Sequence, residues 1–236
     1  MDELQGFPYL MRAMAQWPHV AKVFALFVKK LIDANVWDRA CNDVSAHKPE
    51  YHQRALIPSI EFGVEAAYRL LERSTAIGYP IDVVAVLALC DVGKDRAFCR
   101  RRRNYHRSEI YSAQEVFSWV DIGRNTDDLL LIILHKLGYQ AGMETIRDWS
   151  TKNRQVEVGR LLGVKRKKVR ASTEPDEHWL MRFLAVLSCR CVSRGWTEAQ
   201  ESQRADLARN IVMPICRACN QEELGQLLCE EFILAR

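Results

Sequence analysis

The sequence predicts an all-α protein, and two observations support this fold class. In several segments apolar residues recur at the i, i+3 and i+4 spacing that gives a helix one buried face. Strand signals are nearly absent, because polar and apolar residues do not alternate over any long stretch and Asn-Gly or Asp-Gly hairpin turns do not occur. With 48% apolar residues, the 236-residue chain can form one large helical domain or two smaller ones.

The predicted helices follow in order along the chain, separated by proline and glycine. Pro18 suits the first turn of a helix that runs to about residue 40. The next helix carries the apolar positions between residues 60 and 71 and ends near Gly78. Asp82 is placed to cap a helix over the apolar run 83–90. Later apolar stripes predict helices around residues 130–137 and 180–187.

The chain divides by pattern into three segments. Residues 1–150 hold the N-terminal helices and the main helical domain, and residues 151–172 form a basic segment. Ser172–Asp176, which contains Pro175, is the best candidate for a linker. Beyond it, residues 176–236 form a C-terminal helical segment.

Composition argues against a membrane protein or a secreted one. No apolar run approaches the ~18 residues that span a bilayer, and the start Met1-Asp2-Glu3 lacks the basic residues of a secretory signal. We therefore expect a cytoplasmic protein without a membrane partner. The eight cysteines are then expected to be reduced and buried. Cys189-x-Cys191 and Cys216-x-x-Cys219 offer four thiolates for zinc, but no glycine follows either pair to form a tight turn, so buried thiols are the preferred interpretation.

Positive charge is unevenly spread, although the net charge is only +4. Two clusters stand out, and the first comprises Arg100, Arg101, Arg102, Arg103 and Arg107. The second comprises Lys165, Arg166, Lys167, Lys168 and Arg170. Such clusters attract phosphate groups, so all ten residues are candidates for nucleic-acid binding. The alternative is that each cluster is a solvated surface beside a turn.

The segment Leu87-Ala88-Leu89-Cys90-Asp91-Val92-Gly93-Lys94 reads as a buried helix that ends on an aspartate and is followed by a glycine turn and a lysine. It resembles the metal-binding motif of the HD phosphohydrolase superfamily, in which an apolar helix precedes His-Asp, an apolar residue and Gly-Lys. Cys90 stands where the resemblance requires histidine. The resemblance covers about residues 50–150 and implies an HD-like helical domain.

The rest of the implied ligand set is incomplete. His135 is similar to one member of a downstream histidine pair, with Lys136 in place of the second, and Asp148 resembles the late aspartate. The early histidine is expected near residues 58–61, where none occurs, although His52 lies just upstream. A metal shell needs its full ligand count, so we expect Cys90, Asp91, Lys94, His135 and Asp148 to be vestiges of a catalytic site that retains no metal or cofactor.

The basic segment resembles the helix-turn-helix pattern of bacterial DNA-binding proteins. Gly159 is the small residue where two helices touch, and Gly163 follows at the turn. The second helix would then direct Lys165, Arg166, Lys168 and Arg170 towards DNA. An ordinary helical hairpin with a basic turn is the alternative.

These interpretations predict a non-enzymatic protein that associates with nucleic acid, most directly DNA, or acts as a regulator. HD-like folds joined to DNA-binding segments occur in relaxases and associated proteins of conjugative plasmids, so the resemblance implies a role in a mobile element or phage. A metal-dependent HD phosphohydrolase acting on nucleotides or nucleic acid is the second interpretation. A protein-interaction subunit of a larger assembly is the third.

Overall fold

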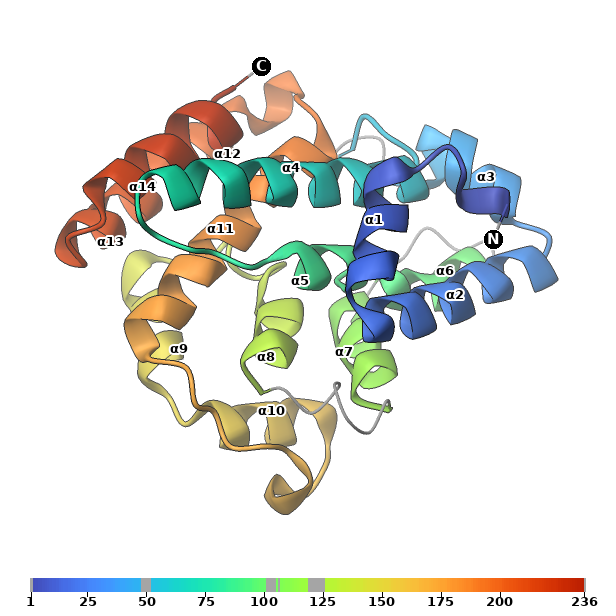
Figure 1. Cartoon of the computed structure of the whole chain (residues 1–236), viewed down its shortest axis with the longest axis horizontal. Coiled ribbons are helices and arrows are strands. Elements are labelled where there is room, and N and C mark those ends of the chain that lie inside the picture. The colour runs from blue at the N-terminus through green and yellow to red at the C-terminus, as the bar shows by residue number, and fades with distance from the viewer. Residues whose placement is uncertain (1, 48–51, 101–104, 106, 119–125, 236) are drawn as a thin grey trace.

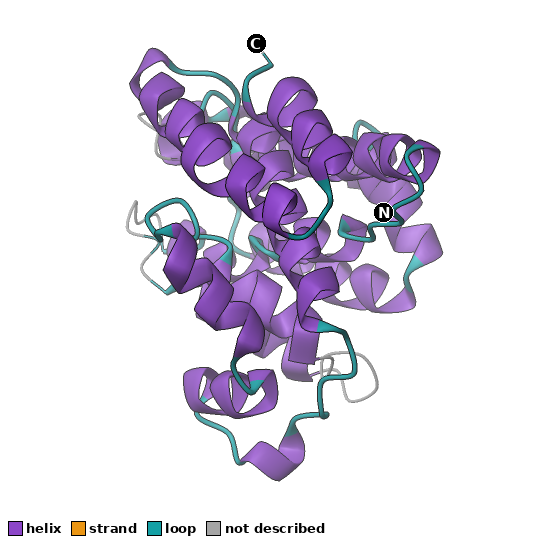
Figure 2. Ribbon diagram, turned by 90° about the vertical axis from the view of Figure 1, so that its left-hand side faces the viewer, coloured by secondary structure: helices purple, strands orange, loops and turns teal. Residues whose placement is uncertain are grey.

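The computed structural model describes residues 2–47, 52–100, 105, 107–118 and 126–235. Over these residues the chain forms helices joined by turns and loops, without a strand (Figures 1 and 2). The predicted all-α class is therefore confirmed. Within the same ranges, no helix combines the length and the apolar character needed to cross a bilayer.

The helices are of uneven length. The α-helices are α1 (Pro8–Gln16), α2 (Pro18–Asp33), α3 (Trp37–Asn42), α4 (Leu56–Ala76), α5 (Val84–Leu89), α6 (Asp95–Phe98), α7 (Ser108–Ser118), α8 (Thr126–Leu134), α9 (Met143–Thr151), α10 (Arg154–Leu162), α11 (Asp176–Arg194), α12 (Glu198–Leu207), α13 (Met213–Ala218) and α14 (Glu222–Leu228). The shorter turns are η1 (Asp2–Leu4), η2 (Val44–His47), η3 (Val92–Lys94), η4 (Arg166–Lys168) and the π turns η5 (Ala208–Val212) and η6 (Cys229–Ile233).

The helices predicted from apolar periodicity are present, but some boundaries differ, and the helix around residues 130–137 is α8, which ends at Leu134. The helix that starts at Pro18 ends at Asp33 rather than near residue 40, because Asn35 adopts a left-handed φ of 52° and α3 begins only at Trp37. Gly78, with a φ of 82°, follows the end of α4. Asp82 accepts a hydrogen bond from the amide of Val84 at the start of α5.

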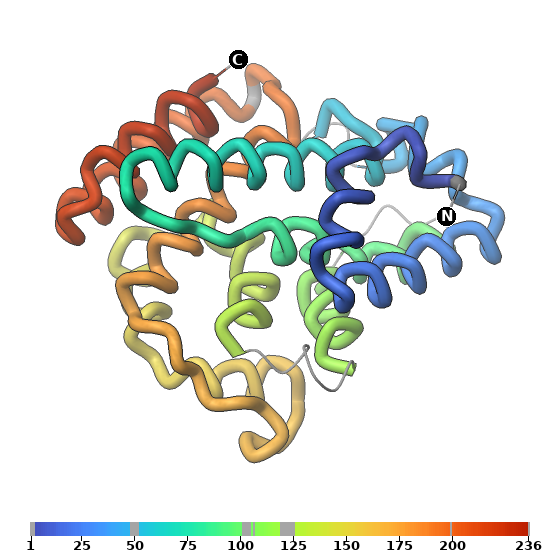
Figure 3. The backbone as a smooth tube through the Cα atoms, in the orientation of Figure 1, coloured from blue at the N-terminus to red at the C-terminus, as the bar shows by residue number. Residues whose placement is uncertain are grey.

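The longest helix, α4, crosses the upper part of the molecule in Figure 3 and packs against α11. One buried apolar cluster runs from Leu4 to Ile233, so residues of all three predicted segments share a single interior. Glu61 of α4 accepts hydrogen bonds from the amides of Tyr9 and Leu10, both at 2.8 Å. These amides are among the unpaired donors at the start of α1, so the carboxylate fixes α1 across the core.

The end of α5 is held by a close approach to α7. A Cβ added at Gly93 would lie 2.3 Å from the backbone nitrogen of Ser112 and 2.4 Å from the carbonyl oxygen of Ser108. The Ser112 hydroxyl accepts from the Gly93 amide at 2.9 Å and donates to the Cys90 carbonyl at 2.8 Å. Glycine is therefore required here by lack of space, and the contact fixes the backbone on both sides of Asp91.

The prediction of a second helix in the basic segment is wrong. After α10, Gly163 turns the chain with a φ of 69°, and residues 166–168 form only the 3-10 turn η4. The Gln155 side-chain amide donates to the carbonyls of Val169 and Arg166, at 2.6 and 3.3 Å. In a second helix these carbonyls would instead accept hydrogen bonds from backbone amides one turn later. The consecutive cations also repel one another. The segment is the alternative basic turn, not a recognition helix.

Candidate functional site

A cavity of about 240 Å³ lies where α5, α8 and α11 meet. Asp91 and Lys94, at and after the end of α5, line it together with His135, which follows α8. Arg190 and Arg194 of α11 line the facing side. Residues distant in sequence, from His47 to Arg194, thus meet around one carboxylate.

Asp91 is buried and forms two ion pairs. One carboxylate oxygen lies 3.0 Å from the Lys94 ammonium, and the other lies 2.9 Å from the Arg190 guanidinium. Burial alone would raise the pKa of Asp91, but the charges of Arg190 and Lys94 outweigh it and hold that pKa well below its usual range. Arg190 is itself fully buried, and its other described contact is to the Ser193 hydroxyl at 3.1 Å.

Two buried histidines stack beside Lys94. The His47 ring donates from Nδ1 to the carbonyl of Arg54, so its Nε2 is free to accept from the Lys94 ammonium at 2.7 Å. The His52 ring stacks on His47 with ring centres 3.9 Å apart. Burial, together with the nearby positive charge, lowers the pKa values of both rings well below their usual range, so both are neutral at pH 7.

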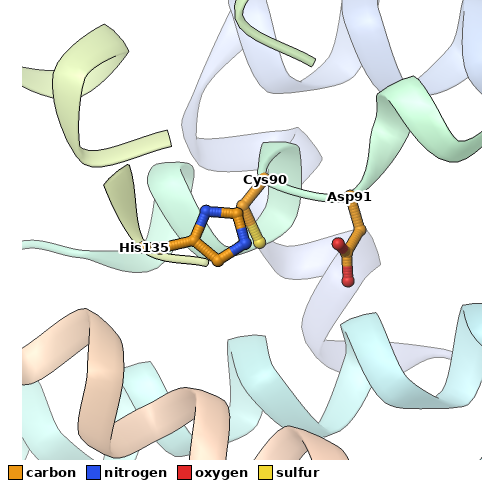
Figure 4. Close-up of side chains that lie close together, drawn as sticks. All are labelled: Cys90, Asp91 and His135. Atoms are coloured by element: carbon orange, nitrogen blue, oxygen red, sulfur yellow. The ribbon is translucent and has the colours of Figure 1, made fainter. Parts of the chain in front are cut away.

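Cys90, Asp91 and His135 form a potential ligand group, shown in Figure 4, with one ligand atom from each within 4.8 Å of the others. His135 donates from Nδ1 to the carbonyl of Ile132 at 2.7 Å, which leaves its Nε2 as an acceptor. Burial, and next the charge of Arg190, lower the pKa of His135 to about 3. Burial raises the pKa of Cys90 to about 12, so the thiol stays protonated at neutral pH.

These residues fit a divalent metal poorly. The Cys90 thiol is buried and donates to the Leu87 carbonyl at 3.5 Å, so a metal bound there would have to displace this proton and its hydrogen bond. Asp91 is the one carboxylate among the described residues that line the cavity, and it already faces two cations. A metal bound to Asp91 would lie close to both the Lys94 and the Arg190 charge, so it would be repelled.

The other predicted site residues lie elsewhere. Asp148 is exposed over 59% of its side chain and pairs with Lys152 one helical turn later, so it is not part of the cavity. The four residues of the basic turn, Lys165–Lys168, are exposed, as is Arg170. Arg100 and Arg107 are also exposed, whereas Arg101, Arg102 and Arg103 lie outside the described residues.

The cysteine pairs of the C-terminal segment do not form a metal group among the described residues. All eight cysteines are free, and Cys189, Cys191, Cys216 and Cys229 are buried. The preferred interpretation, reduced and buried thiols, matches this arrangement.

Sequence reasoning missed three residues of the site, His47, Arg190 and Arg194. His47 lines the cavity and accepts from the Lys94 ammonium at 2.7 Å. It lies in a 3-10 turn before α4, so helix periodicity gave no sign of it. Arg190 lies within the apolar stretch of α11. Because arginine is seldom buried without a partner, its place between apolar residues is the sequence feature that could have indicated a role in the site.

No protein-family model matches this chain, and no curated protein and no solved structure is significantly similar to it.

Proposed function

We propose that this protein is a non-enzymatic, nucleic-acid-associated protein, built on an HD-like helical scaffold whose catalytic site has been lost. The observation that carries the proposal is the exposed basic turn formed by Lys165, Arg166, Lys167 and Lys168, with Arg170 two residues later. The turn lies at the tip of the molecule, at the lower end of Figure 1. Among the described residues, no acidic side chain forms an ion pair with the three lysines or Arg170.

The basic turn rests on a fixed support. Val169 is buried, and the Gln155 amide holds the carbonyls on either side of Lys167. At the base, Arg154 is buried and pairs with Asp127 at 2.7 Å and with Asp176 at 2.8 Å. A fixed support lowers the conformational entropy that phosphate contacts would otherwise cost.

The short turn favours contacts to the nucleic-acid backbone. A recognition helix would place several side chains along the base edges of the major groove, whereas a 3-10 turn of three residues exposes a compact cluster of charge. Lysine and arginine in such a cluster neutralise phosphates without reading sequence. Binding that depends on charge and not on sequence is therefore expected.

The non-enzymatic part of the proposal is supported by Arg190. In a metallohydrolase the buried carboxylate binds a cation that activates water. Here the carboxylate of Asp91 has a guanidinium 2.9 Å away and an ammonium 3.0 Å away. The metal-dependent phosphohydrolase alternative would require a metal ion to displace a buried arginine from its one acidic partner.

A salt series tests the nucleic-acid proposal. Fluorescence anisotropy with short duplex DNA, single-stranded DNA and RNA should give an affinity that falls steeply between 50 and 200 mM salt, roughly one power of the salt concentration per phosphate contact. Replacing Lys165, Arg166 and Lys168 with alanine should weaken binding and reduce the slope of log affinity against log salt by roughly two to three.

The matched control removes three cations that pair with acids elsewhere: Lys29 with Asp33, Lys152 with Asp148 and Arg217 with Glu222. This triple alanine variant has the same net charge as the first and should bind almost as the parent does. Equal losses in the two variants would mean that net charge alone drives binding. No binding by the parent protein would reject the proposal and favour the protein-interaction alternative.

A further inference from the structure

We propose that the cavity around Asp91 is a receptor for a phosphate monoester, held directly by protein cations. This inference does not depend on the basic turn, since none of that turn's residues line the cavity.

The charge balance of the cavity is positive. Lys94 and Arg190 share a single carboxylate, and Arg194 and Lys136 bring two further cations to the wall. Lys136 pairs with Glu109 at 3.0 Å, but among the described residues Arg194 forms no ion pair. The stacked histidines are neutral and contribute no charge. An excess of buried positive charge is costly, and a bound anion would compensate it.

Several residues of the wall carry a buried polar atom without a described hydrogen-bond partner. These atoms are Nε of Arg190, Nε of Arg194, Nδ1 of His52 and the acceptor Oδ2 of Asp91, which lies 2.9 Å from the Arg190 guanidinium. Lys94 has three ammonium hydrogens, of which His47 and Asp91 take two. Arg190 and His52 are both more than nine-tenths buried. Cationic side chains that line one cavity from different elements suit a tetrahedral oxyanion, which accepts hydrogen bonds from several directions.

The second cavity indicates that the anion is part of a larger molecule. A space of about 520 Å³ adjoins the first, and both are lined by Tyr139, Gln140 and Gln203. Its wall also carries Asp206 and Asn210, so it offers amides and a carboxylate but no cation among the described residues. Hydroxyl groups suit such a wall, whereas further phosphates would meet Asp206. A sugar phosphate or a nucleoside monophosphate matches both cavities.

The test is calorimetric titration of the full chain with ribose 5-phosphate, inorganic phosphate and ribose. Both phosphates should bind, ribose should not, and ribose 5-phosphate should bind several-fold more tightly than phosphate. Arg194→Gln should weaken both phosphates about tenfold, as loss of one charge-assisted hydrogen bond implies, and Arg194→Lys should recover part of this loss. Arg194 is only half-buried and packs over the Tyr139 ring, so the variant should fold.

Two variants make the outcome decisive. Asn210→Ala should weaken ribose 5-phosphate but leave inorganic phosphate unchanged, because Asn210 lines the second cavity and not the first. Lys167→Ala, on the basic turn, should change neither. The proposal is overturned if ribose binds as well as its phosphate, if Arg194→Gln binds like the parent, or if Lys167→Ala removes phosphate binding. None of these results depends on whether nucleic acid binds.

Discussion

At the scale of single residues, Arg190 decides the chemistry of the candidate site. Its guanidinium gives Asp91 a second permanent counter-charge, and it also suppresses protonation of the neighbouring histidine, His135. Burial keeps the Cys90 thiol neutral, so it adds no negative charge beside Asp91. The resemblance to an HD motif pointed to Cys90 and Asp91, but the residue that opposes a metal lies one hundred positions later.

The buried histidines predict a loss of stability in mild acid. His47, His52 and His135 have lowered pKa values in the folded protein, that of His135 being about 3, whereas unfolded histidines titrate near 6.5. Below pH 6.5 the unfolded chain therefore binds protons that the folded chain does not. The free energy of unfolding should fall by up to about 1.4 kcal/mol per pH unit for each histidine.

Urea denaturation at pH 7.5, 6.5 and 5.5 measures this effect. His135→Gln should give a shallower dependence on pH, because one of the three groups is removed. A stability that is flat from pH 7.5 to 5.5 would mean that the rings are not buried as described.

At the scale of elements, the contact between η3 and α7 positions the site. Gly93→Ala would drive a Cβ into the backbone of α7, and backbone atoms cannot rotate away. We expect it to cost about 3 kcal/mol of unfolding free energy, at the upper end for overpacking. Gly142→Ala is the control, since no atom lies within 4 Å of its added Cβ, and it should cost less than about 0.5 kcal/mol. Equal small effects in chemical denaturation would contradict the contact.

Elements with strong apolar periodicity were predictable, and elements set by polar contacts were not. The stripes of α4, α8 and α11 reveal their helices because burial follows the helical repeat. A recognition helix was wrongly predicted for the basic segment because Gly159 and Gly163 are compatible with both a helix-turn-helix and a simple turn. The Gln155 side chain stabilises the turn by donating hydrogen bonds to its carbonyls. The hydrogen bond to Val169 spans 14 residues in sequence.

At the scale of the whole molecule, the site depends on the packing of α11 against α4. That packing places Arg190 and Arg194 beside residues that precede α4 or follow α5. Apolar periodicity does not reveal that segments so far apart in sequence lie together. Half of the site, Asp91, Lys94 and His135, was therefore predictable from a local motif. The other half required the assembled core, in which residues from both ends of the chain share one interior.

Metal analysis of the purified protein tests the central claim, that Arg190 and Lys94, and not a metal ion, are the partners of Asp91. The protein should be produced in medium supplemented with manganese, iron and zinc, and its metal content measured by mass spectrometry beside that of Asp91→Ala. We predict far less than one metal ion per chain, with no difference between the two proteins. One manganese, iron or zinc ion per chain that disappears in Asp91→Ala would contradict the account.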